Sequence, residues 1–477
     1  MPLILPGNVA SAAAAGYNVA NSCRLDGVNA YMSRATGVTT TNTKFTLSFW
    51  LKMGETTLVQ TFFETYTDSS NRFWVRFNLD NAGEPRLEVS EYQSAYTFRK
   101  IFTRIFRDMS AHYHFVIRFD STESTDTDRL RVYINGVLET ATDTAGLPAE
   151  DATSNVSNGT QYIGFDYNDQ SNTLGEGYIS EFVLVEGSAL APTSFGEFDS
   201  DSPTIWKPKD VSGLTFGTNG WYLDFEDSGD LGDDESGNGH DFTEVNLAAT
   251  DQSTDTPTNN FCVMNPLAYR LDSGADLVTY SEGNLKAAMT DGTYGTSTMG
   301  TIGVTTGKWY WEVFVTDVND SCFIGITRAE YDPHDNFAGE SIYYDNAGNL
   351  AVGTGTGGTA DGEYGNTWTT DDTIGVAFDA TNGVIWFSKN GTWQNSATIG
   401  EINAGTTTNA ATTGITMSQV WMPFGEGTNE TLEFNLGSPP YTISSGNADG
   451  DGYGNFEYTV PTNYYALCTK NLAEYGG

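Results

Sequence analysis

Hydrophobic and polar residues alternate in many short stretches of this chain, and turns containing glycine, asparagine or aspartate separate them. In residues 45–51, for example, Phe or Leu occupies every second position. An extended strand directs alternate side chains to opposite faces, so this stretch predicts a strand with one buried face. No long segment repeats its hydrophobic positions with the period of a helix. The pattern predicts an all-β protein, and the 52 glycines fit its many turns.

The first half of the chain contains a regular series of such stretches. Asn135-Gly136 lies within one of them and is typical of a type I′ hairpin turn. The expected strands lie within Arg24–Met32, Phe45–Lys52, Phe62–Glu64, Arg72–Phe77, Ala111–Asp120, Leu130–Leu138, Gln161–Phe165 and Gly177–Val185.

The order and spacing of these stretches resemble the laminin G-like, concanavalin A-like lectin family. The resemblance implies a jelly-roll sandwich of two sheets over residues 21–190. It also implies glycan or protein binding at the loop rims, frequently with a calcium ion. Asp166 and Asp169 could supply oxygen ligands to such an ion, although they complete no full set, and a polar loop is the alternative.

The second half contains another series of short strands. Its pieces are Gly307–Val313, Phe323–Ile326, Ser341–Tyr344, Ile374–Asp379, Gly383–Trp393, Trp421–Phe424 and Leu432–Gly437. Their order, with the turn Asn390-Gly391, resembles the SPRY domain over residues 283–440. The resemblance implies a second, bent two-sheet sandwich that presents loops for protein binding and is not catalytic. Residues 441–477 would form a C-terminal extension.

Loops of this second sandwich hold the candidate ligand-binding residues, because loops carry most contact residues in such folds. An inert loop is the alternative for each of them. The candidates are Tyr331, Asp332, His334, Asp335 and Trp368.

Residues 191–282 are expected to form a linker and joint, and they contain the glycine-rich acidic stretch 223–239. From Asp224 to Glu235 this stretch has the register of an EF-hand loop. Flanking helices are not expected, so we do not predict an EF-hand. The stretch also resembles the opening strand and turn of laminin G-like domains. We therefore expect a seam between the sandwiches, with a strand lent to one of them.

A calcium site of another kind is the alternative interpretation of the acidic stretch. Calcium prefers carboxylate and carbonyl oxygens, and four aspartates lie close together in the sequence there. The candidate ligands are Asp227, Asp230, Asp233 and Asp234. On this alternative interpretation, calcium is the one cofactor that the sequence suggests.

The formal net charge of −40 excludes some classes of partner. Nucleic acid is not expected, because phosphate binding needs a positive face. One basic cluster, with Arg99, Lys100, Arg104 and Arg107, is expected to pair with neighbouring acids. Membrane insertion is not expected either, because no stretch reaches the roughly 18 apolar residues of a membrane helix.

The N-terminal residues and the four cysteines were considered for signs of secretion and of metal binding. Residues 1–20 lack the positive start and long apolar run of a signal peptide, and we expect an arm that docks onto a neighbouring subunit, with a disordered tail as the alternative. The four cysteines show no zinc-binding spacing, so we expect free, buried thiols.

The sequence contains none of the common catalytic motifs that we considered. It has no Gly-x-Ser-x-Gly elbow, phosphate-binding loop or His-Glu-x-x-His. Asp224 and Glu226 would face one way if extended, as glycosidase carboxylates do, but a loop-like Ser-Gly-Asp follows them. We therefore expect a protein that is not an enzyme.

The whole arrangement resembles structural proteins of marine bacteriophages. The resemblance rests on the order of the modules, the early Leu5–Val9 and the late Ala466–Leu472. It implies a capsid decoration or tail-fibre subunit, assembled in the host cytoplasm and located in the virion. Its partners would be other virion proteins through the N-terminal arm, a host surface glycan or protein, and further copies of itself as a homo-oligomer. The alternative is a secreted bacterial lectin or polysaccharide-degrading enzyme.

Overall fold

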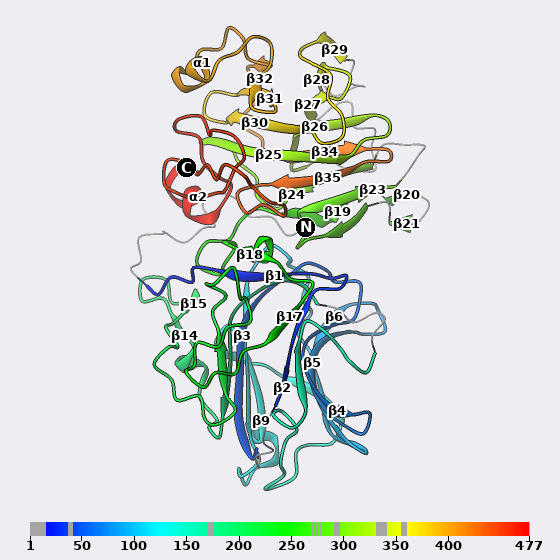
Figure 1. The fold of residues 1–477 in the computed structure, drawn as a ribbon, viewed down its shortest axis with the longest axis vertical. Coiled ribbons are helices and arrows are strands. Elements are labelled where there is room, and N and C mark those ends of the chain that lie inside the picture. The colour runs from blue at the N-terminus through cyan, green and yellow to red at the C-terminus, as the bar shows by residue number, and fades with distance from the viewer. Residues whose placement is uncertain are drawn as a thin grey trace. The chain divides into compact units, whose positions relative to one another are not determined.

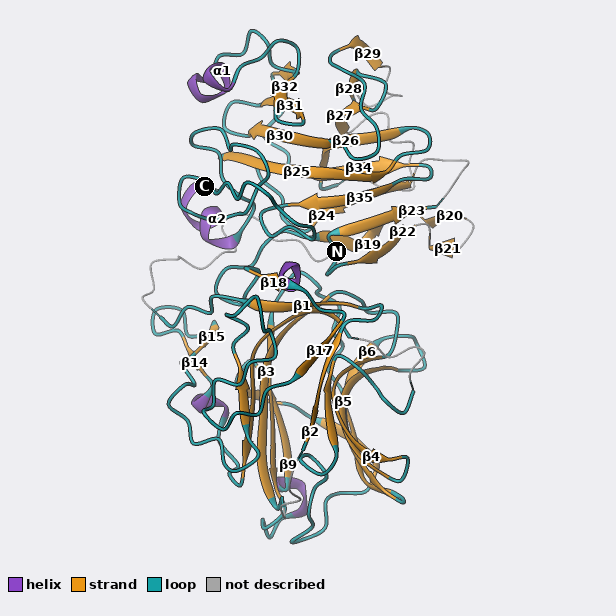
Figure 2. Cartoon of the chain, viewed as in Figure 1, coloured by secondary structure: helices purple, strands orange, loops and turns teal. Residues whose placement is uncertain are grey.

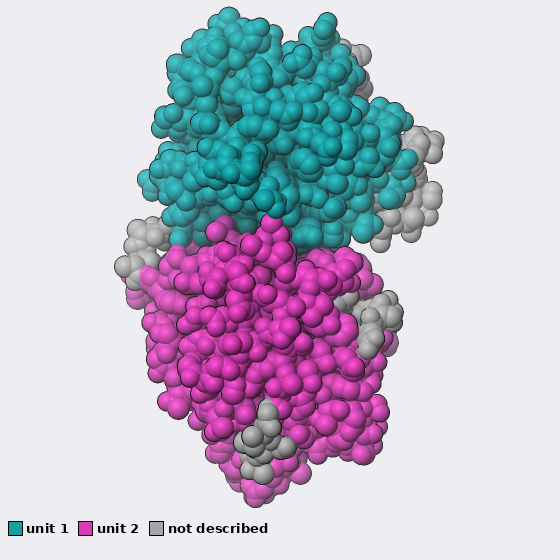
Figure 3. All heavy atoms as spheres, in the orientation of Figure 1, with its two compact units in different colours: residues 1–14, 259–477 teal, residues 15–258 magenta. Residues whose placement is uncertain are grey.

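A computed structural model describes residues 16–36, 42–169, 175–269, 271–272, 275–276, 278–290, 296–330, 341–353 and 360–476. The chain divides into two compact units, which we call the N-terminal unit, residues 15–258, and the C-terminal unit, residues 259–477 (Figure 3). Most of the expected N-terminal arm, residues 1–15, lies outside the described residues.

The N-terminal unit contains two antiparallel sheets (Figure 1). Sheet I has the order β10-β9-β8-β3-β13-β1-β18, and β16 also pairs with β13. Its strands are β1 (Ser22–Asp26), β3 (Lys44–Met53), β8 (Tyr113–Asp120), β9 (Leu130–Ile134), β10 (Val137–Leu138), β13 (Glu176–Glu186), β16 (Trp221–Leu223) and β18 (Gln252–Ser253).

Sheet II has the order β11-β7-β6-β5-β4-β12-β2-β17. Its strands are β2 (Tyr31–Ala35), β4 (Gln60–Asp68), β5 (Asn71–Leu79), β6 (Pro85–Gln93), β7 (Tyr96–Phe102), β11 (Ala141–Ala145), β12 (Thr160–Ile163) and β17 (Thr243–Val245). The unit also has a ribbon of β14 (Gly196–Phe198) with β15 (Trp206–Pro208), and the short 3-10 helices η1 (Asp126–Asp128), η2 (Pro192–Ser194) and η3 (Ala249–Asp251).

The C-terminal unit has two further antiparallel sheets. Sheet III runs β19 (Met264–Tyr269), β24 (Thr296–Gly300), β34 (Trp421–Gly427), β26 (Cys322–Arg328), β27 (Ser341–Asp345), β28 (Asn349–Val352) and β29 (Ala360–Glu363). Sheet IV runs β22 (Val278–Ser281), β23 (Lys286–Met289), β35 (Thr431–Asn435), β25 (Lys308–Asp317), β30 (Thr373–Asp379), β31 (Val384–Lys389) and β32 (Thr392–Trp393), with β33 (Thr412–Thr413) beside β31. The remaining elements are the ribbon β20 (Leu271–Asp272) and β21 (Ala275–Asp276), and the helices α1 (Ile399–Ala404) and α2 (Thr469–Tyr475).

Strands dominate the described residues, which confirms the all-β prediction (Figure 2). The core of the N-terminal unit consists of the alternate hydrophobic residues of the two sheets. Phe45 of β3 meets Phe73 of β5 edge to face, with ring centroids 5.5 Å apart. The hairpin turn Asn135-Gly136 has positive φ at both positions, 49° and 75°, as a type I′ turn requires.

Residues 191–258, which the sequence places in a linker, form part of the N-terminal unit. Leu223 of β16 pairs with Phe182 of β13, while β17 pairs with β2 and β18 pairs with β1. The expectation of a strand lent to a sandwich therefore holds for β16. These strands have two or three residues each, which is too short for an alternating pattern to reveal them.

The C-terminal extension is also integral to its unit. Phe456, Tyr464 and Cys468 are buried in one cluster with Tyr310 and Trp386 of sheet IV. All four cysteines are free and buried, as expected. No helix in the described parts of the chain combines the length and the apolar character needed to cross a membrane.

Candidate functional site on the outer face of sheet II

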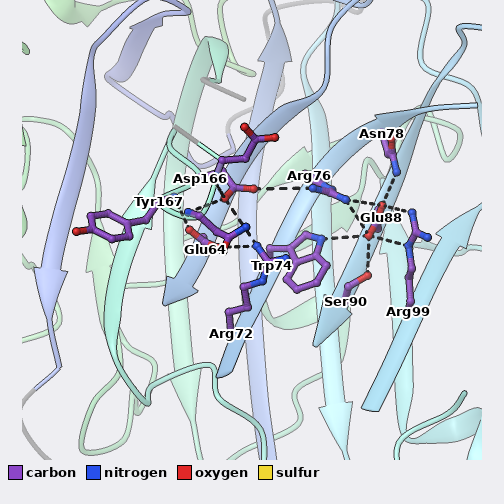
Figure 4. A network of polar contacts seen from close by, with 12 residues as sticks. Glu64, Arg72, Trp74, Arg76, Asn78, Glu88, Ser90, Arg99, Asp166 and Tyr167 are labelled. Carbon is purple, nitrogen blue, oxygen red and sulfur yellow. Dashed lines mark hydrogen bonds and ion pairs between the residues drawn. The ribbon is translucent and has the colours of Figure 1, made fainter. Parts of the chain in front are cut away.

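The outer face of sheet II, which points away from the core, carries a network of charged side chains. Along β5, Phe73, Val75 and Phe77 enter the core. The residues between them therefore lie on the opposite face, because side chains alternate along a strand. The strand register then places Glu64 opposite Trp74, and Trp74 opposite Ser90. Figure 4 shows this network, which the sequence analysis did not single out.

Glu88 of β6 is the centre of the network and is fully buried. Trp74 Nε1 donates to its carboxylate at 3.1 Å, and Arg99 Nε donates at 3.0 Å. Its other donors are Arg76, Asn78 and Ser90. Burial alone would raise the pKa of Glu88, but the hydrogen bonds and charges of Arg99 and Arg76 outweigh it and lower the pKa to about 2.

Glu64 of β4 has the opposite electrostatic environment. Its side chain is 0% exposed, and Oε2 accepts the backbone N–H of Tyr167 at 2.6 Å. Arg72 lies 3.8 Å from Oε1 as an ion pair. Burial first, and then the nearby charge of Asp166, raise the pKa of Glu64 to about 8. The carboxyl of Glu64 therefore gains its charge, and with it the ionic contact to Arg72, only as the pH rises toward that value.

Two arginines hold Trp74 between them. The guanidinium carbons of Arg72 and Arg76 lie 4.5 Å and 5.4 Å from the centroid of the indole ring. Arg76 also reaches Asp166, with 3.8 Å between Nη1 and Oδ2. These cation–π and ionic contacts cover the indole and fix the loop that contains Asp166.

A cluster of five aromatic rings lies beside the network, and we call it the aromatic platform. It consists of Tyr31, Tyr66, Tyr162, Phe165 and Tyr167. Tyr31 and Phe165 stack with centroids 4.4 Å apart, and Tyr162 and Tyr167 stack at 5.2 Å. Tyr167 is the most accessible ring, at 41% exposure. Because Glu64 binds the backbone of Tyr167, the network positions the platform.

The loop from Asp166 to Asp169 has a clear structural role in this arrangement. Asp166 Oδ1 accepts the backbone N–H groups of Asn168 and Asp169 at 3.0 Å and 2.9 Å. Its carboxylate is almost completely buried and faces Arg72 and Arg76. These contacts are those of a polar loop, which was one of the two sequence-based interpretations.

The ligand-binding residues expected in the C-terminal unit fall in two groups. Tyr331, Asp332, His334 and Asp335 lie outside the described residues. Trp368 is described, and it is 3% exposed. Its ring lies 6.2 Å from that of Tyr344, so it contributes to the packing of the unit.

The four expected calcium ligands have different local environments. Asp234 is buried and accepts the backbone N–H groups of Tyr222, Ser236 and His240. Asp227 accepts the N–H of Gly229, which is a local turn contact. Burial and the charges of Asp241, Asp230 and Asp227 raise the pKa of Asp233. Among the residues that the structure describes, no three His, Cys, Asp or Glu side chains form a metal-binding group. Calcium binding stays a prediction.

Asp224 and Glu226 do not form the extended carboxylate pair considered from the sequence. Strand β16 ends at Leu223, and Phe225 has a positive φ of 62°. Asp224 instead accepts the backbone N–H of Glu226 at 2.9 Å. The turn breaks the alternation that would direct both side chains to one face.

The three arginines of the basic cluster around β7 pair with acids, as expected, whereas Lys100 Nζ donates to the backbone carbonyl of Leu130 at 3.3 Å. Arg99 binds Glu88, and Arg104 binds Glu139 with 2.9 Å between Nε and Oε1. Arg107 binds Glu84 through two hydrogen bonds. The charges of the three arginines are therefore matched locally.

Comparison with known families agrees with both sandwiches. A model described as the concanavalin A-like lectin/glucanases superfamily matches residues 26–192, and a SPRY domain model matches residues 308–437. No curated protein matches the chain.

Several solved structures are similar to parts of the chain. The SPRY domain of human HERC1 is 16% identical, with 36% of this chain and 96% of that chain covered and a TM-score of 0.28. A SAP-like pentraxin from Limulus polyphemus is 14% identical, covering 37% and 80%, with a TM-score of 0.28. Domain 4 of AbnA, an extracellular arabinanase from Geobacillus stearothermophilus in complex with arabinotriose, is 16% identical, covering 39% and 82%, with a TM-score of 0.27. The chain therefore contains one region that is similar to the concanavalin A-like lectin/glucanases superfamily and another that is similar to the SPRY domain.

Proposed function

We propose that the chain is a non-enzymatic adhesion subunit of a virion that binds a surface glycan through its aromatic platform. The observation that carries the binding proposal is the exposed ring of Tyr167, whose backbone is fixed by the buried Glu64. The virion assignment rests on the order of the two modules and on the terminal motifs of the sequence. Other virion proteins, reached through residues 1–20, and further copies of the chain are the proposed partners.

The chemistry of the platform fits a sugar ring. Aromatic faces pack against the apolar C–H face of a saccharide, while phenolic hydroxyls exchange hydrogen bonds with its hydroxyl groups. Tyr162 and Tyr167 stack on one another, so their ring positions are largely set before a ligand arrives. Such preorganisation reduces the entropy lost on binding.

A glycan array with the full chain tests the binding proposal. We expect wild-type protein to bind at least one glycan and Tyr167→Ala to lose roughly tenfold in affinity, as removal of a stacking ring would cause. Phe198→Ala is the matched control, because Phe198 is 45% exposed in the same unit and does not belong to the platform. An absence of glycan binding, or equal effects of the two substitutions, would reject the platform as the site.

Immunoelectron microscopy tests the virion assignment separately. Purified particles from a host carrying the gene should be labelled on their outside by antibodies against the chain. Particles that contain no copy of the chain would reject the virion assignment, even if the glycan array gave a positive result.

One observation favours a polysaccharide hydrolase as a second candidate. Glu64 and Glu88 lie on adjacent parts of one sheet face, and their pKa values are shifted in opposite directions, to about 8 and about 2. In many acid–base enzymes, a carboxyl with a raised pKa donates a proton while a second carboxyl with a low pKa stays charged. Both side chains are covered from solvent, however, so a substrate would have to displace the arginines. Release of reducing sugar by wild-type protein, abolished by Glu64→Gln, would favour this candidate.

A further inference from the structure

A pocket of about 530 Å³ lies in the C-terminal unit, outside the site proposed above. Two segments line it: residues 363–366, which begin at the end of β29, and residues 393–396, which begin at the end of β32. Strand β29 belongs to sheet III and β32 to sheet IV, so the pocket lies where the ends of two sheets meet. Both strands are labelled in Figure 1. Its volume is typical of small-molecule sites.

Gln394 joins the two walls of the pocket. Its side chain is 3% exposed, and Oε1 accepts the backbone N–H of Asn366 at 2.9 Å. Its Nε2 donates to the carbonyl of Thr392 at 2.6 Å. A Cβ at Gly365 would lie 2.7 Å from Gln394 Oε1, so the walls approach too closely for a larger residue there. The pocket therefore has a rigid base.

The wall at 395–396 has an unusual backbone. Asn395 and Ser396 both adopt left-handed conformations, with φ of 53° and 63°. Each such residue other than glycine costs about 1 kcal/mol, and such conformations concentrate at binding sites. Helix α1 begins directly after this wall, and a capping box between Thr398 and Glu401 stabilises its first turn. Asn409 Nδ2 binds Glu401 Oε1 at 3.1 Å and lies 3.4 Å from the carbonyl oxygen of Ser396.

The polar side chains of the lining retain their capacity for hydrogen bonds. Glu363, Asn366, Asn395 and Ser396 are exposed, and their side chains make no hydrogen bond or ion pair within the described parts of the chain. Trp393 is half-buried and rests against Tyr310, with ring centroids 6.4 Å apart. The lining contains no Lys, Arg or His.

From this lining we propose that the pocket binds a neutral saccharide. A carboxylate, two amides and a hydroxyl can exchange hydrogen bonds with sugar hydroxyls, and an indole can cover an apolar sugar face. The negative charge of Glu363, with no cation beside it in the lining, disfavours an anionic ligand. This site is independent of the aromatic platform and would give the chain two saccharide sites.

Affinity electrophoresis of the full chain tests this proposal with four neutral polysaccharides: β-glucan, mannan, galactan and xylan. The experiment uses the Tyr167→Ala background, so that binding at the platform is weakened throughout. We expect at least one polysaccharide to retard this protein. Adding Glu363→Gln or Asn366→Ala should then weaken the retardation roughly fivefold to tenfold, as loss of a hydrogen bond to the ligand would.

Glu474→Gln is the matched control for Glu363→Gln. Glu474 is an exposed glutamate of α2 in the same unit and does not line the pocket. Circular dichroism of each variant checks that the fold is retained, and Asn395→Gly removes the amide while keeping the left-handed backbone. The proposal is overturned if no polysaccharide retards the protein, or if the pocket variants and the control behave alike. Neither of these outcomes depends on the platform.

Discussion

The outer face of sheet II and the pocket of the C-terminal unit are both polar, but they differ in how their groups are satisfied. In the sheet II network, the charged groups pair with each other, and Glu88 alone accepts bonds from five side chains. In the pocket, Glu363 and Asn366 are exposed and make no side-chain contact of this kind among the described residues. Buried, paired groups fix the shape of a site, whereas exposed and unpaired groups are available to a ligand.

The comparison predicts its largest effect on stability at Glu88. Glu88→Gln removes the charge that Arg76 and Arg99 face, and loss of one partner from a buried ion pair is costly. We expect the free energy of unfolding of the N-terminal unit to fall by about 3 kcal/mol. Urea denaturation followed by tryptophan fluorescence measures the change.

Glu84→Gln is the control for this substitution, because the Glu84–Arg107 pair lies in loops next to β6 and β7 of the same unit, where Arg107 is exposed. We expect no measurable change for the control. Equal effects of the two substitutions would show that the buried Glu88 network contributes no more to the free energy of unfolding than the Glu84–Arg107 pair does.

The second prediction concerns pH and Glu64. The pKa of Glu64 is raised in the folded protein to about 8 from its ordinary value of 4.5. Between these values the folded state holds a proton that the unfolded state has released, so this group's stabilisation is full below about pH 4.5 and is lost as pH rises to 8. The expected slope approaches 1.4 kcal/mol per pH unit inside that window.

Urea unfolding of wild type and Glu64→Gln at several pH values measures this slope. The substitution should remove most of Glu64's contribution, because glutamine does not titrate. Glu84→Gln again serves as the control for the removal of a carboxylate from the same unit. An identical pH dependence for wild type and Glu64→Gln would contradict the assigned environment of Glu64.

The third prediction concerns the strained wall of the pocket. Ser396→Gly places a residue without a Cβ at a φ of 63°, so we expect the C-terminal unit to gain up to about 1 kcal/mol in unfolding free energy. The same substitution removes a hydroxyl from the pocket and should weaken polysaccharide retardation. A gain in stability with unchanged retardation would show that the left-handed backbone at Ser396 costs stability but that its hydroxyl does not contribute to polysaccharide binding.

The smallest expected effect is that of calcium on the acidic stretch. Burial and then neighbouring carboxylates raise the pKa of Asp233, and neighbouring carboxylates raise that of Glu235, so a bound cation would relieve their mutual repulsion. We expect millimolar calcium to raise the thermal midpoint slightly and Asp233→Asn to reduce that rise. If calorimetry detects no heat on addition of calcium, the predicted calcium site in the acidic stretch is rejected.

The strands with long alternating patterns could be predicted from the sequence, and the polar network could not. The pattern of 45–51 identifies β3 because one whole face of that strand is hydrophobic. The meeting of Glu64, Trp74 and Glu88 depends on the register between three strands, which no single segment encodes. The alternating Arg72, Trp74 and Arg76 were the available signal, because two charges flank an aromatic residue on one face.

The pocket was equally hidden in the sequence. Asn366 and Asn395 come from loops of different sheets, and Gln394 joins them by a contact that only the folded chain provides. The Asn390-Gly391 turn could be predicted, because both positions need positive φ and this pair adopts it readily. The left-handed Asn395 and Ser396 carry no comparable signal.

Hydrogen–deuterium exchange of the full chain tests the central claim most directly, by locating the bound glycan on the platform. The strongest ligand from the glycan array is added to wild-type protein, and exchange is followed by mass spectrometry. We predict slower exchange in peptides covering residues 160–169, where Tyr162, Phe165 and Tyr167 lie, and a clearly smaller change in Tyr167→Ala at the same ligand concentration. Glycan binding that leaves exchange at 160–169 unchanged would contradict the account.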